Sequence, residues 1–138
     1  MFFSNKALSI FSLAAAVSAL SVSYDQGYDD ASRLMTAVAC SDGPNGLITK
    51  YGWETQGAIP KFPNIGGWEG IEGWGSTNCG TCLQLTYNGK SINVLAIDHA
   101  AAGANIALEA MNVLTNNQAE FLGRVEADVV QLDISACL

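Results

Sequence analysis

The sequence predicts a mainly β protein, a small β-barrel with one clear helix, held by two disulfide bonds. Three observations predict this class: several segments alternate apolar with polar residues, one segment has helical spacing, and four cysteines occur in a short chain. The chain has 138 residues, which suffices for one domain and is too short for two ordinary ones.

We expect residues 1–19 to form a secretory signal peptide, cleaved after Ala19 or within a few residues of it. Lys6 precedes an uncharged, alanine-rich run from residue 7 to residue 20, and Val17-Ser18-Ala19 is a small-residue cleavage pattern. A membrane anchor is less favoured, because a span needs about 20 strongly apolar residues and serines dilute this run. The predicted mature domain covers residues 20–138 and is secreted to the outside of the cell.

The first part of the mature chain predicts short strands around a turn. The polar segment Ser21–Asp30 predicts an irregular arm. Leu34–Ala39 and Leu47–Tyr51 are expected as strands, and the residues between Ser41 and Gly46 favour turns.

The stretch Gly52–Gly80 predicts loops with short strand pieces, because glycine and proline at this density break helices and long strands alike. It also holds all three tryptophans, Trp53, Trp68 and Trp74. Core packing is the expected role for any one of them. One or two could instead lie on the surface and stack on sugar rings.

The clearest local prediction is a β-hairpin. The segments Leu83–Tyr87 and Ser91–Ile97 flank Asn88-Gly89, a dipeptide that favours the tight turns of hairpins. The second strand becomes wholly apolar near Leu95-Ala96-Ile97, which predicts burial on both faces in a closed barrel or a sandwich.

One helix and a final strand complete the predicted elements. Asn105–Leu114 has an apolar stripe at helical spacing, with Asn105 as its N-cap and Met111 in its buried face. Arg124–Ile134 is expected as the last strand. Its apolar residues change parity, which predicts a β-bulge near Val129-Val130.

The cysteines indicate a structural disulfide framework, because an even number in a short exported chain favours pairing. The four are Cys40, Cys79, Cys82 and Cys137. Bridges across the chain would each contribute roughly 3–4 kcal/mol, and spacing alone leaves their pairing open. A redox or zinc role for the C-x-x-C motif is less favoured, because the motif runs into a strand pattern and the chain has one histidine.

The charge balance excludes nucleic acid as an expected partner. Without residues 1–19, 5 Lys and Arg remain against 13 Asp and Glu, a net charge of −8. Such a chain, which has no basic cluster, repels phosphate backbones. The mature sequence also indicates no membrane partner, no metal site and no organic cofactor.

Ten segments of the mature chain together match one known family. They are SVSYD (21–25), ACSDG (39–43), NGLITK (45–50), IGG (65–67), NCGTC (78–82), QLTYNG (84–89), SINVLAIDHA (91–100), NIAL (105–108), AMN (110–112) and LGRV (122–125). Their order and the placement of the cysteines resemble the cerato-platanins, which filamentous fungi secrete. The segment Ile65–Gly70 departs from the family pattern by adding an aromatic and an acidic residue in a variable loop, which affects the detail of the groove.

The resemblance implies a six-stranded double-psi β-barrel with one or two short helices and the bridges Cys40–Cys79 and Cys82–Cys137. It implies a secreted, cell-wall-associated protein without catalysis, which binds chitin or N-acetylglucosamine oligomers in a shallow groove. Expansin-like loosening of cell-wall polysaccharides, self-assembly at interfaces and elicitation of plant defence are further implied properties.

Asp98 is the residue we expect at the centre of carbohydrate binding. It ends an apolar strand, and it lies where similar proteins carry an aspartate linked to expansin-like activity. We expect it to accept hydrogen bonds from sugar hydroxyls or the N-acetyl amide. Asp42 is as well explained by an Asx turn as by a binding role. The other candidates are Asn78, Gly80 and Gln84 near the disulfide junction, Tyr24 as a stacking face, and His99.

Two alternative functions stay open on the sequence. An endoglucanase-like glycoside hydrolase on the same barrel would need two carboxyl groups about 5–10 Å apart, and the sequence pairs no second carboxylate with Asp98. For His99, a local hydrogen-bonding role is favoured over catalysis. An interfacial coat protein has little direct support, because the chain lacks an amphipathic helix of the interfacial kind. Because the family resemblance implies a protein without catalysis, we do not expect an enzyme.

Overall fold

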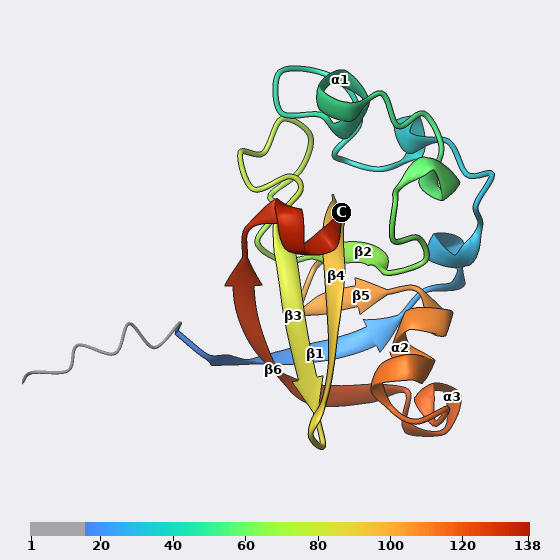
Figure 1. Ribbon diagram of the computed structural model, residues 1–138, viewed down its shortest axis with the longest axis vertical. Helices are drawn as coiled ribbons and strands as arrows, with labels where there is room; N and C mark the ends of the chain where they lie inside the picture. Colours follow the sequence, from blue (N-terminus) through green and yellow to red (C-terminus); the bar gives the residue numbers. More distant parts are fainter. Residues whose placement is uncertain (1–15) are drawn as a thin grey trace, which may run out of the picture.

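The computed structural model describes residues 16–138, which form a closed six-stranded β-barrel (Figure 1). The strands are β1 (Ser18–Tyr24), β2 (Ile65–Trp68), β3 (Cys82–Tyr87), β4 (Lys90–His99), β5 (Ala104–Ile106) and β6 (Arg124–Leu132). Around the barrel they follow the order β1, β5, β2, β4, β3, β6. β1 with β5 and β2 with β4 are parallel, and the other neighbours are antiparallel. The predicted six-stranded barrel is confirmed.

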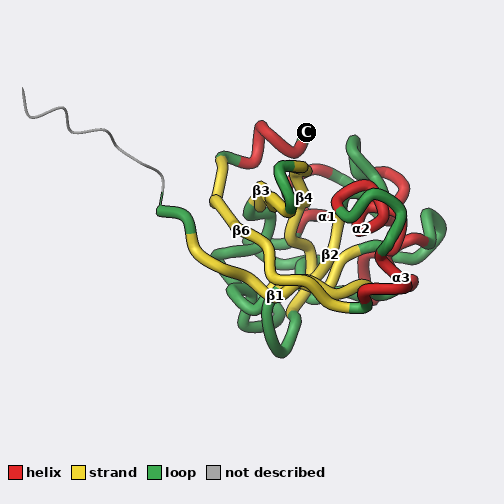
Figure 2. The backbone as a smooth tube through the Cα atoms, turned by 90° about the horizontal axis from the view of Figure 1, so that it is seen from below, coloured by secondary structure: helices red, strands yellow, loops and turns green. Residues whose placement is uncertain are grey.

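Short helical elements join the strands. They are α1 (Leu47–Tyr51), α2 (Leu108–Leu114) and α3 (Ala119–Leu122), with 3₁₀ turns at Gln26–Asp29, Met35–Ala37, Gln56–Ala58 and Ile134–Cys137. In Figure 1, α1 and the long connection between β1 and β2 lie at one end of the barrel. Figure 2 shows α2 and α3 to one side of the strands. Within residues 16–138, no helix has the length and apolar character needed to cross a membrane.

The predicted hairpin is confirmed. β3 and β4 pair antiparallel and close at Tyr87 and Lys90. Between them, Asn88 and Gly89 have φ angles of 47° and 78°. Positive φ at both central positions is what a type I′ turn requires, and this turn matches the twist of the strands. The apolar end of β4 is buried on both faces, as its composition predicted.

The helix predicted at Asn105–Leu114 is wrong in its first turn, which is a strand. These residues form β5, in which Ile106 is fully buried in the barrel wall. Asn105 is therefore not an N-cap. The first two N–H groups of α2 instead donate to the Asp29 carboxylate, at 2.8 and 2.9 Å. This carboxylate comes from a segment 79 residues earlier, which local sequence cannot reveal. The predicted burial of Met111 is confirmed.

Two predicted strands, Leu34–Ala39 and Leu47–Tyr51, are wrong. Only the first residue of the former makes a β-bridge, and a 3₁₀ turn follows it. The latter is α1, which ends where Gly52, at φ 75°, donates its N–H to the Ile48 carbonyl. β-branched and aromatic residues favoured strands here, but tertiary surroundings outweigh that preference in segments this short.

The irregular arm predicted at Ser21–Asp30 is wrong in its first half, because β1 runs to Tyr24. This strand pairs with β5 and β6 at once and so closes the barrel. Most of the predicted signal peptide lies outside the described residues. Its expected cleavage after Ala19 would fall within β1. The signal peptide and the domain boundary at residue 20 stay predictions.

The β-bulge predicted near Val129-Val130 is wrong, since β6 keeps one constant register against both β1 and β3. Leu132 and Ile134 pack half-buried against the core. The apolar residues therefore change parity because the end of the chain is partly covered, and not because an extra residue is inserted in the strand. The register shift lies instead after Gly66 in β2, against β4. A Cβ atom at Gly66 would lie 2.5 Å from the Asn105 carbonyl oxygen, so only glycine fits there.

The disulfide pairing implied by the family resemblance is confirmed, with Cα atoms 5.5 Å apart in Cys40–Cys79 and 5.7 Å apart in Cys82–Cys137. The first bridge joins the loop before α1 to the loop before β3. The second joins the start of β3 to the last 3₁₀ turn. One bridge therefore holds the loops at the end of the barrel, and the other holds the end of the chain.

Candidate functional site

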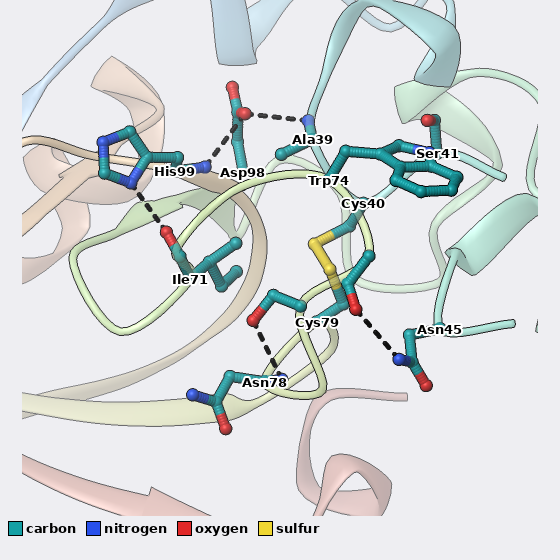
Figure 3. The surroundings of a disulfide bond; sticks show 12 residues. Ala39, Cys40, Ser41, Asn45, Ile71, Trp74, Asn78, Cys79, Asp98 and His99 are labelled. Atoms are coloured by element: carbon teal, nitrogen blue, oxygen red, sulfur yellow. Dashed lines mark hydrogen bonds between the residues drawn. A yellow bond between two sulfur atoms is a disulfide. The ribbon is translucent and has the colours of Figure 1, made fainter. Parts of the chain in front are cut away.

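Asp98 lies near the end of β4, and its carboxylate accepts three internal hydrogen bonds. Oδ1 accepts the backbone N–H groups of Ala39 and His99, both at 2.9 Å (Figure 3). Oδ2 accepts the Tyr28 hydroxyl at 2.8 Å. Because a carboxylate oxygen offers two lone pairs, Oδ1 is saturated and Oδ2 keeps one position for a further donor. The carboxylate thus joins the barrel to two separate loops.

Tyr28 is the buried partner of this carboxylate. Burial of the ring, followed by the hydrogen bond to Asp98 and its negative charge, raises the pKa of Tyr28 far above its usual value of 10.0. The Arg33 guanidinium lies 5.4 Å from the ring centroid and opposes this shift only in part. The hydroxyl therefore stays protonated and keeps donating to Asp98 at neutral pH.

We expect Tyr28 to ionise late in an alkaline titration. Its pKa is higher in the folded protein than in the unfolded chain. The stabilisation from the protonated hydroxyl is therefore complete below about pH 10 and is lost as the pH rises toward the folded pKa. Ultraviolet absorbance of tyrosinate should show a component well above pH 10, and Tyr28→Phe should remove it. A variant that keeps the late component would contradict this burial of the hydroxyl.

His99 follows Asp98 and is fixed by the loop after β2. Its Nδ1 lies 2.6 Å from the Ile71 carbonyl oxygen. Because a carbonyl oxygen only accepts, Nδ1 carries the proton in this contact. Within residues 16–138, no three His, Cys, Asp or Glu side chains gather into a group that could hold a metal ion. The histidine thus orders a loop beside the strand end.

An open groove of 370 Å³ runs beside the Tyr28–Asp98 pair. It is lined by Ser23, Asp25, Tyr28, His99, Ala100, Ala101, Ala102, Asn105 and Arg124. The Ser23 hydroxyl donates to Asn105 Oδ1 at 3.1 Å, so β1 and β5 together form one polar wall. The groove is lined by hydroxyl, amide, imidazole, carboxylate and guanidinium groups and by three alanines. These groups can hydrogen-bond a polar, uncharged ligand from several sides.

Asp42 lies two residues beyond Cys40 and binds the indole of Trp74. Asp42 Oδ1 accepts from Trp74 Nε1 at 2.7 Å and from the Ser41 hydroxyl at 3.2 Å. The indole hydrogen bond is the largest cause that lowers the pKa of Asp42 below its usual value. The carboxylate therefore serves neighbouring side chains.

Asn78 and Gly80 flank the other half of the Cys40–Cys79 bridge. Asn78 is exposed, and its Nδ2 donates to the Gly70 carbonyl at 2.8 Å. Gly80 is buried at φ 84°, and a Cβ atom there would lie 3.2 Å from the side chains of Leu47 and Ile134. Asn78 is therefore placed to meet a ligand, whereas Gly80 serves close packing beneath the surface.

Gln84 and Tyr24 lie on other parts of the barrel. Gln84 is half-buried in β3, opposite Asn93 of β4 and Val130 of β6. Tyr24 ends β1 and packs partly buried against the core. Neither residue lines the groove beside Tyr28. Of the predicted residues, His99 lines the groove and Asp98 is hydrogen-bonded to the groove residue Tyr28 without lining the groove itself. Asp42 and Asn78 instead lie close in sequence to the cysteines of the first bridge.

Sequence reasoning missed most of the groove wall, and it allowed for an exposed tryptophan without identifying Trp74 as that residue. Trp53 and Trp68 are each 9 % exposed and pack in the core, whereas Trp74 is 64 % exposed. A usable signal was present, because glycines on both sides of Trp74 make a strand there improbable. Ser23, Tyr28 and Arg124 gave no such signal, since strands and turns from distant parts of the chain bring them together.

These features define a small, disulfide-bonded β-barrel protein with an open polar groove at one edge. Comparison of sequences gives the family. A sequence model described as Cerato-platanin matches residues 20–138, and the chain therefore belongs to the cerato-platanin family.

Relatives and solved structures agree with this assignment. The chain is 49 % identical over 116 residues to a heat-stable 19 kDa antigen of Coccidioides immitis, covering 84 % of this chain and 79 % of the relative. It is 40 % identical over 132 residues to cerato-platanin of Ceratocystis fimbriata f. sp. platani, covering 94 % and 95 %. An allergen of Aspergillus fumigatus is 51 % identical over 118 residues, covering 86 % and 76 %.

Two solved structures show the same fold. The crystal structure of cerato-platanin 1 from M. perniciosa superposes with a TM-score of 0.82 at 47 % identity, covering 86 % of this chain and 99 % of that one. The solution structure of the fungal elicitor cerato-platanin gives 0.76 at 41 % identity, covering 86 % and 96 %. The chain is thus of the type whose members are named as fungal elicitors, antigens and allergens.

Proposed function

We propose that this protein binds N-acetylglucosamine oligomers of chitin without cleaving them, as a secreted protein of the fungal cell wall. The observation that carries the proposal is the open, polar groove lined by Tyr28, the hydrogen-bond partner of Asp98. A sugar chain presents hydroxyl and amide groups along its edges, and the groove presents matching donors and acceptors. Loosening of wall polysaccharides and elicitation of plant defence belong to the same proposal as consequences of binding the wall.

The hydrogen bonds of the carboxyl groups support binding over hydrolysis. A glycosidase needs a carboxylic acid with a raised pKa, facing a second carboxylate. The carboxyl pKa values that shift in this structure, those of Asp30, Asp42 and Asp133, are all lowered, chiefly by hydrogen bonds. Asp98 already accepts three internal hydrogen bonds, so its carboxylate acts as an acceptor within the fold.

Calorimetric titration with an N-acetylglucosamine tetramer tests the proposal. We expect saturable heat with the wild-type protein and an affinity about tenfold lower in Asp98→Asn, because a charge-assisted hydrogen bond to the sugar is lost. The asparagine keeps an oxygen that accepts from Ala39 and His99, so the fold is retained. Asp128→Asn is the matched control, because Asp128 is an exposed carboxylate on β6, outside the groove.

The outcomes separate the candidate functions. No heat with the wild-type protein would overturn the carbohydrate-binding proposal. An equal loss in Asp98→Asn and Asp128→Asn would show that overall charge, and not the groove, governs binding. Release of reducing sugar from chitin or cellulose would instead support the endoglucanase-like alternative.

A further inference from the structure

Trp74 is an exposed aromatic ring with a fixed orientation. Its side chain is 64 % exposed, whereas the other two tryptophans are buried. Indole Nε1 donates to Asp42 Oδ1 at 2.7 Å, so its one polar atom is already satisfied. What remains open to solvent is the apolar carbon surface of the largest side chain available to proteins.

The backbone beneath the ring leaves room only for glycine. Gly43 has φ 77°, and a Cβ atom built there would lie 2.8 Å from Trp74 Cζ2 and 3.3 Å from Cη2. The indole therefore lies directly against the main chain of the loop before α1. One side of the ring is supported by the protein, and the rest is available for contact.

The two loops that carry Trp74 and Asp42 are tied together at further points. The Cys40–Cys79 bridge joins them covalently, and Asn45 Nδ2 donates to the Gly75 carbonyl at 3.0 Å. Figure 3 shows Trp74 beside this bridge, with Asp98 and His99 nearby. Because folding has already fixed the ring, a ligand that stacks on it loses little further conformational entropy of the protein.

We propose that Trp74 and Asp42 form a sugar subsite in which the indole stacks on the apolar face of a pyranose ring while Asp42 Oδ2 accepts a hydroxyl hydrogen bond. A pyranose carries C–H groups on its faces and O–H groups on its edge. The aromatic face, which is electron-rich, attracts the C–H groups, and a carboxylate is a strong acceptor for the edge. This inference rests on the proposed function and extends it to a second position on the surface.

The surrounding charges select an uncharged ring. From residue 62 to residue 89 the sequence holds Glu69 and Glu72 but no lysine or arginine, so this loop offers no cation to pair with a phosphate. A stacked nucleotide is therefore disfavoured beside Asp42. A neutral hexose unit can stack on the indole ring and donate a hydroxyl hydrogen bond to the carboxylate.

The subsite lies within reach of Asp98. Asp98 Oδ1 is hydrogen-bonded to Ala39 N–H at 2.9 Å, and Asp42 is three residues further along the chain. At about 3.3 Å per residue, the backbone sets a separation of at most about 10 Å between Ala39 and Asp42. An oligosaccharide can therefore contact both positions, whereas a single sugar contacts one. We expect affinity to rise with chain length only when Trp74 is present.

The test compares Trp74→Ala with Phe121→Ala, which removes another exposed aromatic ring, 88 % exposed on α3. We expect Trp74→Ala to bind the N-acetylglucosamine tetramer about tenfold more weakly, because ring stacking is lost, and Phe121→Ala to bind it like the wild type. In the wild-type protein, the tetramer should also protect tryptophan fluorescence from a soluble quencher, since Trp74 is the only exposed tryptophan among residues 16–138.

Asp42→Asn gives a second measurement that keeps an acceptor for the indole. We expect it to weaken tetramer binding, because the sugar hydroxyl loses its charged acceptor. If the wild-type protein binds the tetramer and Trp74→Ala binds it equally, the subsite is wrong while the proposed function stands. If the wild-type protein binds no tetramer, both are overturned.

Discussion

Removing the Cys82–Cys137 bridge by the double substitution Cys82→Ala, Cys137→Ala is expected to lower the free energy of unfolding by about 4 kcal/mol. The bridge closes a loop of 55 residues, and the chain-entropy model assigns this cost to a loop of that length. Both cysteines are buried, so the substitutions also remove packed sulfur atoms from the core. Thermal or denaturant unfolding should show the loss, as a melting temperature lower by roughly 15 °C.

The other bridge provides the matched comparison. Cys40–Cys79 closes 39 residues, so its removal should cost nearly the same stability. It holds the two loops that carry Asp42 and Trp74, whereas Cys82–Cys137 holds β3 to the last 3₁₀ turn. We therefore expect loss of Cys40–Cys79 to reduce tetramer binding as well as stability. Equal binding by the two folded double variants would contradict this separation of roles.

The parts of the fold that sequence predicted are those with local causes. The hairpin follows from Asn88-Gly89, whose backbone conformations suit few other residues. The two-sided burial of β4 follows from its unbroken apolar run. The disulfide pairing came from the family resemblance, because spacing allowed more than one pairing. In each case the residues that determine the feature are neighbours in the sequence, or the feature is implied by the resemblance to a family.

The wrong predictions share a tertiary cause. β5 forms a strand of three residues because Ile106 is needed in the barrel wall, and a carboxylate from a distant turn caps the helix that follows. Residues 47–51 fold as α1 although their composition favours a strand, because Leu47 is fully buried in the core and the first N–H groups of the helix donate to carbonyls of the preceding loop. Local preference is weak over segments of three to five residues, so packing decides their structure.

The candidate site was predictable only in part, for the same reason. Asp98 was visible as an acid that ends an apolar strand. Its bonds to Tyr28 and Ala39 span 70 and 59 residues of sequence, and no local pattern announces them. The pairing of Trp74 with Asp42 spans 32 residues, and the indole packs against Gly43 in the same loop as Asp42. Such contacts between distant segments can be recognised only in the folded structure.

Replacing Asp98 by alanine is expected to cost about 3 kcal/mol of folding free energy, apart from any effect on sugar binding. The substitution leaves the buried Tyr28 hydroxyl and the Ala39 N–H without their acceptor, and each orphaned group costs about 1–3 kcal/mol. Asp98→Asn should cost about 1 kcal/mol, because its amide oxygen still accepts from the backbone. Denaturant unfolding at neutral pH measures both values.

A double-mutant cycle with Tyr28→Phe shows whether this stability comes from the predicted contact. Phenylalanine keeps the packed ring and removes only the hydroxyl, so Asp98→Ala should cost about 1–2 kcal/mol less in that background. Additive effects would mean that the two side chains do not interact. The cycle also explains why binding studies need Asp98→Asn: an alanine variant that fails to bind could have lost either the sugar contact or the loops around it. Because the asparagine variant retains the backbone contacts, a selective loss of binding in it assigns to Asp98 a direct contact with the ligand.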